Sequence, residues 1–453
     1  MKTGLLNRRV VITGMGIVSS AGLSLDRLWD VCCSGKSSVR RLDIPHFDSS
    51  VAPYCSPASE FSGKIEDFGD LDGNLKKNIR KGLKLMSREI QMGVASAQFA
   101  LNHACLKSGI YPSERIGVSF ASDYIITTPD EVLDGMRACR NGNAFDFSRW
   151  AQNGLVKMTP IWQLKFLPNM PASHIAIYNE FFGPGFAITN REASIGTALE
   201  ESVEIIRSGR ADIMVVGATG SRLHPFKLIH AIQQGTLSTE QGNPENICRP
   251  FDLYRNGTVP GEGAGALILE NAESALKRKA VIYAEIIGGS SRCVIHKNKN
   301  AKDSNSVFAS AVDDIEKSLT LTLSSLLQKY QRSPESIGHI NAFGLGARQY
   351  DSAEAKAIRN VFGNVANSIP VTTLKGHLGN PGAGGGAIEL IAGILALKNN
   401  ALFPILNNRN DDLECPIHPV RTFGEPTGDS FIKLCYQKFG QSSAVLLQRW
   451  NEQ

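Results

Sequence analysis

Several features that mark whole classes of protein are missing from the sequence. No apolar run approaches the roughly 18 residues of a membrane-spanning helix, and the charged segment 1–9 leads into a strand-like run rather than a signal core. The nine cysteines have irregular spacing, with no CxxC pair and no Cys/His ligand set. Lysines and arginines are dispersed, and the net charge is +5. These absences argue against a membrane span, a disulfide scaffold, a metal site and nucleic-acid binding, and they favour a soluble protein of the cytoplasm.

A nucleotide-binding glycine loop is also incomplete. Gly14 and Gly16 follow a β-branched run that starts at Val10, but Ser19 stands where GxGxxG needs its third glycine. The two glycines instead predict close packing at the end of a strand. Without a phosphate loop or a metal-ligand cluster, the sequence predicts no cofactor.

What the chain does contain predicts a large α/β protein. It has 453 residues, 42% of them hydrophobic, which is enough for two fused halves or one duplicated domain. Strand-like runs alternate with helix-like patterns, and the alternation recurs in the second half. The expected strands are 8–18, 115–122, 211–218, 261–270 and 339–346, and the expected helices are 25–32, 85–101, 199–208 and 312–326. The patterns of 36–80 and 123–170 predict loop-like or irregular segments, and that of 292–307 predicts a polar surface insertion.

The segment 183–198 contains the sharpest junction in the chain. An apolar run with small residues passes directly into a helical pattern formed by Leu199, Val203 and Ile206. A strand-to-helix turn of this kind displays one side chain. Here the displayed residue is Glu192.

These motifs, taken in order, resemble the β-ketoacyl synthases, the condensing enzymes of fatty-acid and polyketide synthesis. The opening RRVVITGMGIVSSAG resembles their first strand, and RPFD, RNG, GEGAG and LE follow in the family order between 249 and 270. The resemblance covers nearly the whole chain. It implies a thiolase-like fold with duplicated βαβαβαββ halves stacked in five layers (α-β-α-β-α). The halves are expected at 1–270 and 271–453, with a cap or interface segment at about 123–182.

In that family a cysteine takes up the acyl chain, and two histidines assist decarboxylation of the malonyl unit and stabilise the charge on its thioester oxygen. The resemblance puts Glu192 at the cysteine position. The first histidine motif aligns with 341–347 and puts Phe343 at the histidine position. A carboxylate is a far weaker nucleophile toward a thioester, and a phenyl ring can neither donate nor accept a proton.

The second histidine motif fits in two registers. One uses His377 and keeps a Gly-His pair, but it loses the upstream lysine and needs an insertion before Glu389. The other has no gap, keeps both Lys375 and Glu389, and puts Asn380 at the histidine position. We prefer the ungapped register because it retains both charged anchors. Asparagine can donate a hydrogen bond to an oxygen, but it has no proton to transfer near pH 7.

Part of the family scaffold is expected to remain. The resemblance implies that Lys375 and Glu389 form a buried charged pair beside the nucleophile position. It also implies that the turn with Phe439 and Gly440 closes the site and supplies a backbone N–H to the oxyanion hole, although Lys438 and Gln441 replace two of its glycines. The first histidine motif continues near the site into two acidic residues, Asp351 and Glu354.

Structural roles compete with functional ones at several positions. Glu192 can pair with Arg191 or Lys375 and fill an inactive pocket, act as an acid or base, or contact a ligand. Ser194 is expected to cap or pack a helix start rather than replace the nucleophile. His174 is expected to have a structural role. Cys248 and Cys435, which lie near motif segments, are expected to be buried and unreactive.

The loss of all three chemical groups predicts a homologue without ordinary condensation activity. The first hypothesis is a partner subunit that resembles a polyketide chain-length factor, pairs with an active ketosynthase and contacts an acyl carrier protein. The second is an active acyltransferase or thioester-processing enzyme with Glu192 as base and Asn380 at the oxyanion site. The third is a homodimer that binds an acyl ligand without turnover.

Overall fold

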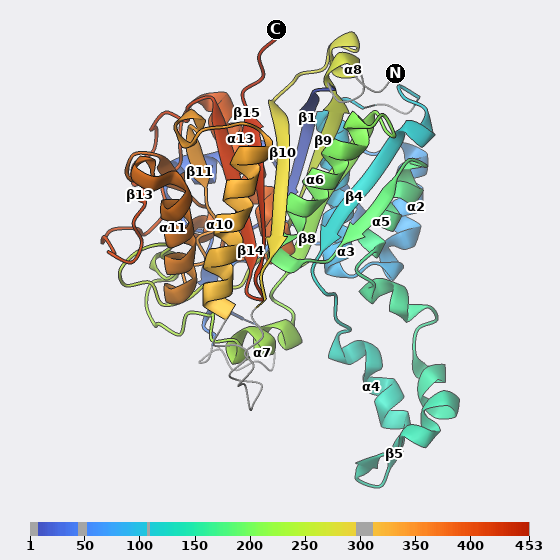
Figure 1. Ribbon diagram of the computed structural model, residues 1–453. Helices are drawn as coiled ribbons and strands as arrows, with labels where there is room; N and C mark the ends of the chain where they lie inside the picture. Colours follow the sequence, from blue (N-terminus) through green and yellow to red (C-terminus); the bar gives the residue numbers. More distant parts are fainter. Residues whose placement is uncertain (1–7, 44–51, 107–108, 296–310, 453) are drawn as a thin grey trace.

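The computed structural model describes residues 8–43, 52–106, 109–295 and 311–452. Within these ranges eleven strands form one sheet, in the order β13-β12-β11-β14-β15-β10-β1-β9-β8-β4-β7 (Figure 1). Their bounds are β1 Val10–Val18, β4 Ile116–Ser122, β7 Gly185–Ile188, β8 Ile213–Ser221, β9 Glu262–Asn271, β10 Ala284–Cys293, β11 His339–Asn341, β12 Pro370–Thr372, β13 His418–Pro419, β14 Ser430–Gln437 and β15 Gln441–Gln448. Two short ribbons pair β2 Arg40–Arg41 with β3 Tyr54–Cys55, and β5 Arg140–Asn141 with β6 Ala144–Phe145.

The sheet is built from two halves with the same topology, which meet where β1 pairs with β10. In the first half the order is β7-β4-β8-β9-β1, and in the second it is β12-β11-β14-β15-β10. In each half the two outer pairings are parallel and the two inner pairings are antiparallel. The strand pattern therefore confirms the expected duplication.

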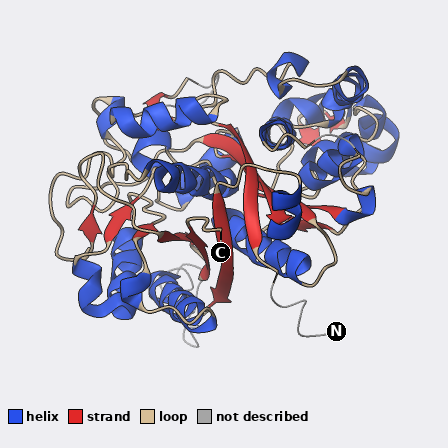
Figure 2. Cartoon of the chain, turned by 90° about the horizontal axis from the view of Figure 1, so that it is seen from above, coloured by secondary structure: helices blue, strands red, loops and turns tan. Residues whose placement is uncertain are grey.

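Helices cover and separate the halves. The helix α6 and the helix α13 pack between them, α3 with α5 covers the outer face of the first half, and α10 with α11 covers that of the second (Figures 1 and 2). The five-layer thiolase-like arrangement is thus confirmed. The helices are α1 Leu25–Ser34, α2 Gly73–Gly82, α3 Arg88–His103, α4 Pro129–Ala138, α5 Met170–Asn179, α6 Ser194–Arg207, α7 Pro225–Gln233, α8 Ala272–Lys277, α10 Ala311–Lys329, α11 Arg348–Phe362, α12 Lys375–Leu378 and α13 Ala383–Asn399.

Gly14 and Gly16 lie where β1 crosses α3. A Cβ on Gly14 would come within 2.4 Å of the carbonyl oxygen of Ala100, and one on Gly16 within 2.3 Å of that of Ser96. Neither distance is compatible with a side chain. The prediction that these glycines serve close packing is confirmed.

Two segments expected to be irregular contain helices. Segment 36–80 includes the start of α2, whose N-cap Asp72 accepts a hydrogen bond from the Leu75 amide. The sequence did not predict α2, because this helix buries only Ile79 and so has no apolar stripe. Segment 123–170 includes α4, and most of the predicted insertion, 292–307, lies outside the described residues.

The cap segment projects from the body of the molecule (Figure 1). It includes α4, the β5–β6 ribbon and several short helical turns. The edge strand β7 lies next to it in the chain and is largely exposed. Exposed apolar residues in this region include Phe145, Phe147, Val156, Ile161, Ile177 and Phe182. Across the described residues, no helix has the length and hydrophobicity needed to span a membrane.

Candidate functional site

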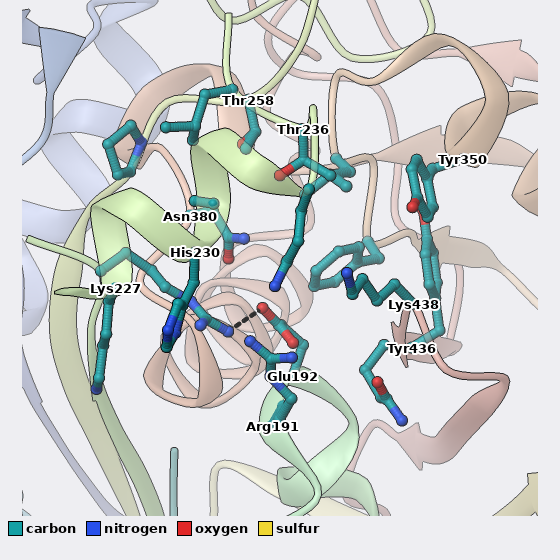
Figure 3. A pocket seen from close by; sticks show the side chains of 18 of the residues that line it. Arg191, Glu192, Lys227, His230, Thr236, Thr258, Tyr350, Asn380, Tyr436 and Lys438 are labelled. Carbon is teal, nitrogen blue, oxygen red and sulfur yellow. Dashed lines mark hydrogen bonds and ion pairs between the residues drawn. The ribbon is translucent and has the colours of Figure 1, made fainter. Parts of the chain in front are cut away.

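Glu192 is positioned by a strained turn after β7. Residues Arg191–Ala193 form a short 3-10 turn, and α6 begins directly afterwards at Ser194. Arg191 has a φ of 52°, in the left-handed region that non-glycine residues seldom adopt. Strain of this kind costs on the order of 1–3 kcal/mol and is often found at functional sites. The turn directs Glu192 into a pocket (Figure 3).

Arg222 and Asp123 hold the Glu192 carboxylate in a buried ion-pair network. Arg222 Nη2 lies 2.5 Å from Glu192 Oε1 and 2.9 Å from Asp123 Oδ2. The side chains of Glu192, Arg222 and Asp123 are 13%, 9% and 0% exposed. Asp123 directly follows β4, Arg222 directly follows β8, and Glu192 lies four residues beyond β7. Three adjacent strands therefore deliver these groups to one point.

The network keeps Glu192 ionised. Burial raises the pKa of the Glu192 carboxyl, but the positive charges of Arg222 and Arg191 outweigh burial and hold that pKa below its usual range. For Arg222, burial opposes the charged form, yet Asp123 and Glu192 together raise its pKa. The expected ion-pair partner of Glu192 was Arg191 or Lys375, and this was wrong, because Arg222 makes the contact. Neither Arg222 nor Asp123 was identified from the sequence.

The surrounding pocket holds about 620 Å³ of space, including solvent at its mouth. Its wall combines the ion-pair network with hydroxyl, amide, aromatic and further cationic groups. The lining residues are Tyr124, Arg191, Glu192, Arg222, Lys227, His230, Ala231, Gln234, Thr236, Leu237, Thr258, Pro260, Phe343, Leu345, Tyr350, Asn380, Tyr436, Gln437 and Lys438. The three positions singled out by the motifs, Glu192, Phe343 and Asn380, therefore share one pocket.

Phe343 and Asn380 are both held firmly in the wall. The Phe343 ring packs against Tyr436 at a centroid distance of 4.7 Å, and Lys375 Nζ lies 4.0 Å from the Phe343 centroid. Asn380 Oδ1 accepts a hydrogen bond of 3.1 Å from the Gly382 amide. Asn380 can still present its amide N–H groups, but neither side chain can transfer a proton.

His377, the histidine of the other register, does not line this pocket. It is fully buried in α12 and meets Phe403 edge-on at 6.2 Å. Neither ring nitrogen has a hydrogen-bond partner among the described residues. Burial lowers the pKa of His377 to about 4. This placement fits the ungapped register, in which Asn380 takes the histidine position.

A second charged cluster lies behind the pocket. Lys375 forms an ion pair with Glu389, and Lys433 Nζ lies 2.5 Å from Glu389 Oε2. Lys433 also donates to the Ala342 carbonyl at 3.0 Å. Burial opposes the charged form of Lys433, but Glu389 outweighs it and raises the pKa. The expected pairing of Lys375 with Glu389 is present. Lys433 was not predicted from the sequence, although a lysine inside the apolar run of β14 indicates a buried charge.

Asp351 and Glu354 hold the loop that carries Phe343. Glu354 accepts hydrogen bonds from the amides of Phe343 and Gly344 at 2.7 and 2.8 Å. Asp351 accepts from the Gly346 amide at 3.0 Å and from the Phe251 amide at 2.8 Å. Burial raises the pKa of Asp351 to about 6 and that of Glu354 to about 7, against the effect of these donors. Both residues act on the backbone of the site rather than in the pocket.

Phe439 and Gly440 lie in the turn between β14 and β15. The Phe439 amide donates to the Gln437 side-chain oxygen at 3.0 Å, so this N–H, expected at an oxyanion hole, already has an acceptor. Gly440 has a φ of 81°, which explains glycine at that point of the turn. Phe439 contacts the pocket cations, because Arg191 Cζ lies 5.8 Å and Lys438 Nζ 4.9 Å from its ring centroid.

The other candidates are structural. Ser194 is buried, makes no capping hydrogen bond, and its hydroxyl has no partner among the described residues. His174 is buried in α5 and stacks on Tyr178, and burial lowers its pKa to about 4. All nine cysteines are described and are free thiols. Burial raises the pKa of Cys248 to about 12 and that of Cys435 to about 11, as expected for unreactive thiols.

Comparisons with known proteins agree with this architecture. Residues 7–275 match the β-ketoacyl synthase N-terminal domain, and residues 293–409 match its C-terminal domain. The chain is 31% identical over 420 residues to the chloroplastic 3-oxoacyl-[acyl-carrier-protein] synthase I of Hordeum vulgare, covering 91% of this chain and 83% of that protein. It is 28% identical over 441 residues to the tetracenomycin polyketide synthase ketoacyl synthase alpha subunit of Streptomyces glaucescens, with 97% of each chain covered.

Among solved structures, the ishigamide ketosynthase/chain length factor superimposes with a TM-score of 0.78 at 22% identity, covering 98% of this chain and all of that one. This likeness concerns the fold. Together with the matched domains and relatives, it identifies the architecture described above as that of the thiolase-fold ketosynthases. The chain therefore belongs to the β-ketoacyl synthase family of fatty-acid and polyketide biosynthesis.

Proposed function

We propose that this protein is a condensation-deficient ketosynthase homologue that acts as a partner subunit of an active ketosynthase, in the manner of a chain-length factor. The observation that carries the proposal is the ion pair of Glu192, at the family's cysteine position, with Arg222. An ionised carboxylate held by an arginine cannot form the acyl thioester on which condensation depends. Phe343 and Asn380 provide no imidazole at the other two family positions.

The surface of the cap supports the partner role. Phe147 and Phe182 of the cap segment are 74% and 68% exposed, and Phe182 lies just before the edge strand β7 in the chain. Exposed apolar groups beside an unpaired strand edge favour a protein interface. The ishigamide structure joins a ketosynthase with a chain length factor, which makes a heterodimer the partner arrangement to test first. The same proposal includes an acyl carrier protein as a second partner and a location in the cytoplasm. It also includes a boundary between the two halves of the chain at 270/271.

The alternative of an active enzyme with Glu192 as general base has less support. A base that accepts a proton near neutral pH needs a raised pKa, whereas Arg222 and Arg191 lower that of Glu192. The Phe439 amide, expected at the oxyanion site, is bonded to Gln437. An acyl-binding homodimer without turnover remains the third hypothesis, and the experiment below separates it from the other two.

The test is intact mass spectrometry after incubation with acyl and malonyl carrier-protein thioesters, with and without active ketosynthases of the same genome. We expect no acyl adduct and no carbon dioxide from the protein alone, and a stable heterodimer whose product length differs from that of the partner alone. Glu192→Cys is the matched control, because a thiol beside Arg222 and Arg191 is expected to become acylated while condensation stays absent. An adduct or carbon dioxide release by the unmodified protein would overturn the proposal. A homodimer that retains acyl ligand and ignores every partner would support the third hypothesis.

A further inference from the structure

The start of helix α11 has no cap and opens into a second cavity. Its N-cap residue, Ala347, offers no side-chain acceptor, and the amides of Arg348, Gln349 and Tyr350 have no acceptor in the described part of the chain. These four residues line a cavity of about 1440 Å³, a volume that includes the solvent at its mouth. Of this wall, only Tyr350 also lines the pocket that holds Glu192. The 15-residue helix therefore directs the positive end of its dipole toward the cavity.

Arginines from two segments of the chain surround this helix end. Arg249 and Arg255 lie in the loop before β9, and Arg348 is the first residue of α11. Arg249 forms an ion pair with Glu240, and Arg255 Nη1 lies 2.5 Å from Asp412 Oδ2. Arg348 is exposed and has no carboxylate within ion-pair distance among the described residues. Its guanidinium is therefore available to a ligand in the cavity.

Arg255 lies beneath the helix end and keeps one donor without a partner. Its side chain is 0% exposed, and its Nη2 donates to the Arg348 carbonyl at 2.8 Å. Its Nε–H has no hydrogen-bond acceptor among the described residues, and Asp351 Oδ2 lies 3.8 Å away. A buried donor without an acceptor is costly. Because Arg255 also lines the cavity, an oxygen of a bound ligand can supply the missing acceptor.

The wall calls for several acceptor oxygens on one ligand rather than for negative charge alone. Three carboxylates, those of Glu240, Asp351 and Asp412, face the three arginines, so these charges balance. The groups without partners are N–H donors, which belong to the first turn of α11 and to two of the arginines. A phosphate group has three strong acceptor oxygens and suits the N-terminus of a helix. Tyr254, which is 62% exposed, adds an aromatic face to the same wall.

We propose that this cavity binds a phosphate monoester, with its phosphate at the start of α11 beside Arg348 and its organic group against Tyr254. The cavity lies outside the pocket of Glu192 apart from the shared Tyr350. The inference therefore goes beyond the partner-subunit function and does not depend on it. A free phosphate ion would use the same N–H donors but not the aromatic face. Comparison of an aromatic phosphate ester with inorganic phosphate separates these two sources of the same group.

The experiment is isothermal titration calorimetry of the full-length protein at pH 7.5 with phenyl phosphate, inorganic phosphate and phenol. We expect phenyl phosphate to bind at one per chain, roughly fivefold more tightly than inorganic phosphate, and phenol not to bind. Arg348→Gln should weaken the binding of phenyl phosphate roughly tenfold, and Tyr254→Ala should remove its advantage over inorganic phosphate. Arg359→Gln is the matched control, because that arginine lies in the last turn of the same helix and bonds Asn367. It should bind phenyl phosphate as the parent does.

A variant that caps the helix gives a second readout. Ala347 already has the extended backbone of an N-cap, with a φ of −104° and a ψ of 130°. An aspartate there would accept from the amides of the first turn and repel an anion. Ala347→Asp should therefore weaken the binding of phenyl phosphate by more than roughly tenfold without lowering the thermal stability of the protein. No saturable binding of phenyl phosphate, equal binding of inorganic phosphate or of phenol, or undiminished binding in Arg348→Gln or Ala347→Asp would each overturn the proposal.

Discussion

Two buried carboxylate clusters lie within the same site region, and they differ in charge and in access to water. Glu389 is enclosed with two lysines, Lys375 and Lys433, and the three side chains are between 0% and 3% exposed. Glu192 lies in the wall of a pocket, where its side chain is 13% exposed, and it shares Arg222 with the buried Asp123. In the first cluster one carboxylate pairs with two lysines. In the second, one arginine, Arg222, pairs with two carboxylates.

The difference separates scaffold from site. Lys433 bonds the Ala342 carbonyl, and Lys375 faces the Phe343 ring, so the enclosed cluster fixes the backbone on which the pocket is built. The cluster around Arg222 joins Glu192, which lines the pocket, to Asp123, which is fully buried. The sequence resemblance predicts that Lys375 and Glu389 are the family's charged pair and that Glu192 takes the position of its nucleophile.

The largest effect is expected when the enclosed cluster loses its carboxylate. Glu389→Gln leaves Lys375 and Lys433 buried without a counter-charge, and this kind of change costs about 3–5 kcal/mol of unfolding free energy. Urea unfolding at neutral pH measures it. Asp429→Asn serves as control, because that carboxylate is 89% exposed and its loss should change stability by less than about 0.5 kcal/mol. A loss near 1 kcal/mol in Glu389→Gln would remove the contrast between the two clusters.

A smaller effect is expected in the pocket wall. Arg222→Met leaves Glu192 and Asp123 without their shared cation, but water in the pocket can reach Glu192, so we expect a loss of about 1–3 kcal/mol. Arg137→Met is a suitable control, since that arginine is largely exposed in the cap. A loss as large as that of Glu389→Gln would show that the pocket wall is as closed to water as the core.

The pH dependence of Arg222→Met follows from the same cluster. In the parent, the lowered pKa of Glu192 adds stability that is present above its ordinary pKa, near 4.5, and is lost as the pH falls through the folded-state value. Without Arg222, burial raises that pKa, so the penalty of the variant is greatest at neutral pH and shrinks as Glu192 takes up a proton. The gap in unfolding free energy between parent and variant should therefore narrow from pH 7 to pH 4. A gap that stays constant would assign the loss to packing rather than charge.

The sequence was most informative where one local pattern decides the structure. Apolar runs predicted β1, β8 and β9, and the junction at 183–198 predicted the turn that displays Glu192. Ordered motifs led to Phe343 and Asn380, and these positions do meet in one pocket. Their chemical roles stay predictions, because the geometry shows proximity and not activity.

The missed residues depend on contacts between distant segments. Asp123 and Arg222 belong to no motif, yet each comes directly after a buried strand, and β4 and β8 are adjacent and parallel. Polar residues at the carboxyl ends of neighbouring parallel strands converge at one edge of a sheet, which is a signal that could have identified both. The partner of Glu192 was missed because strand order, rather than sequence distance, decides which charges meet.

The smallest effect concerns a buried titratable group with no charge partner. His377 lies in α12 beside Lys375, and burial lowers its pKa to about 4, so the unfolded chain binds more protons than the folded one between that value and about 6.5. His377 therefore reduces stability as the pH falls through this range. His377→Leu removes the effect and should raise stability relative to the parent by about 1–2 kcal/mol more at pH 5 than at pH 8, as measured by urea unfolding. If the difference in unfolding free energy between His377→Leu and the parent were the same at pH 8 and pH 5, the His377 ring would be protonated inside the fold. A protonated ring needs an acceptor for its N–H groups, so the region around Glu389 would then be open to water, as the pocket is.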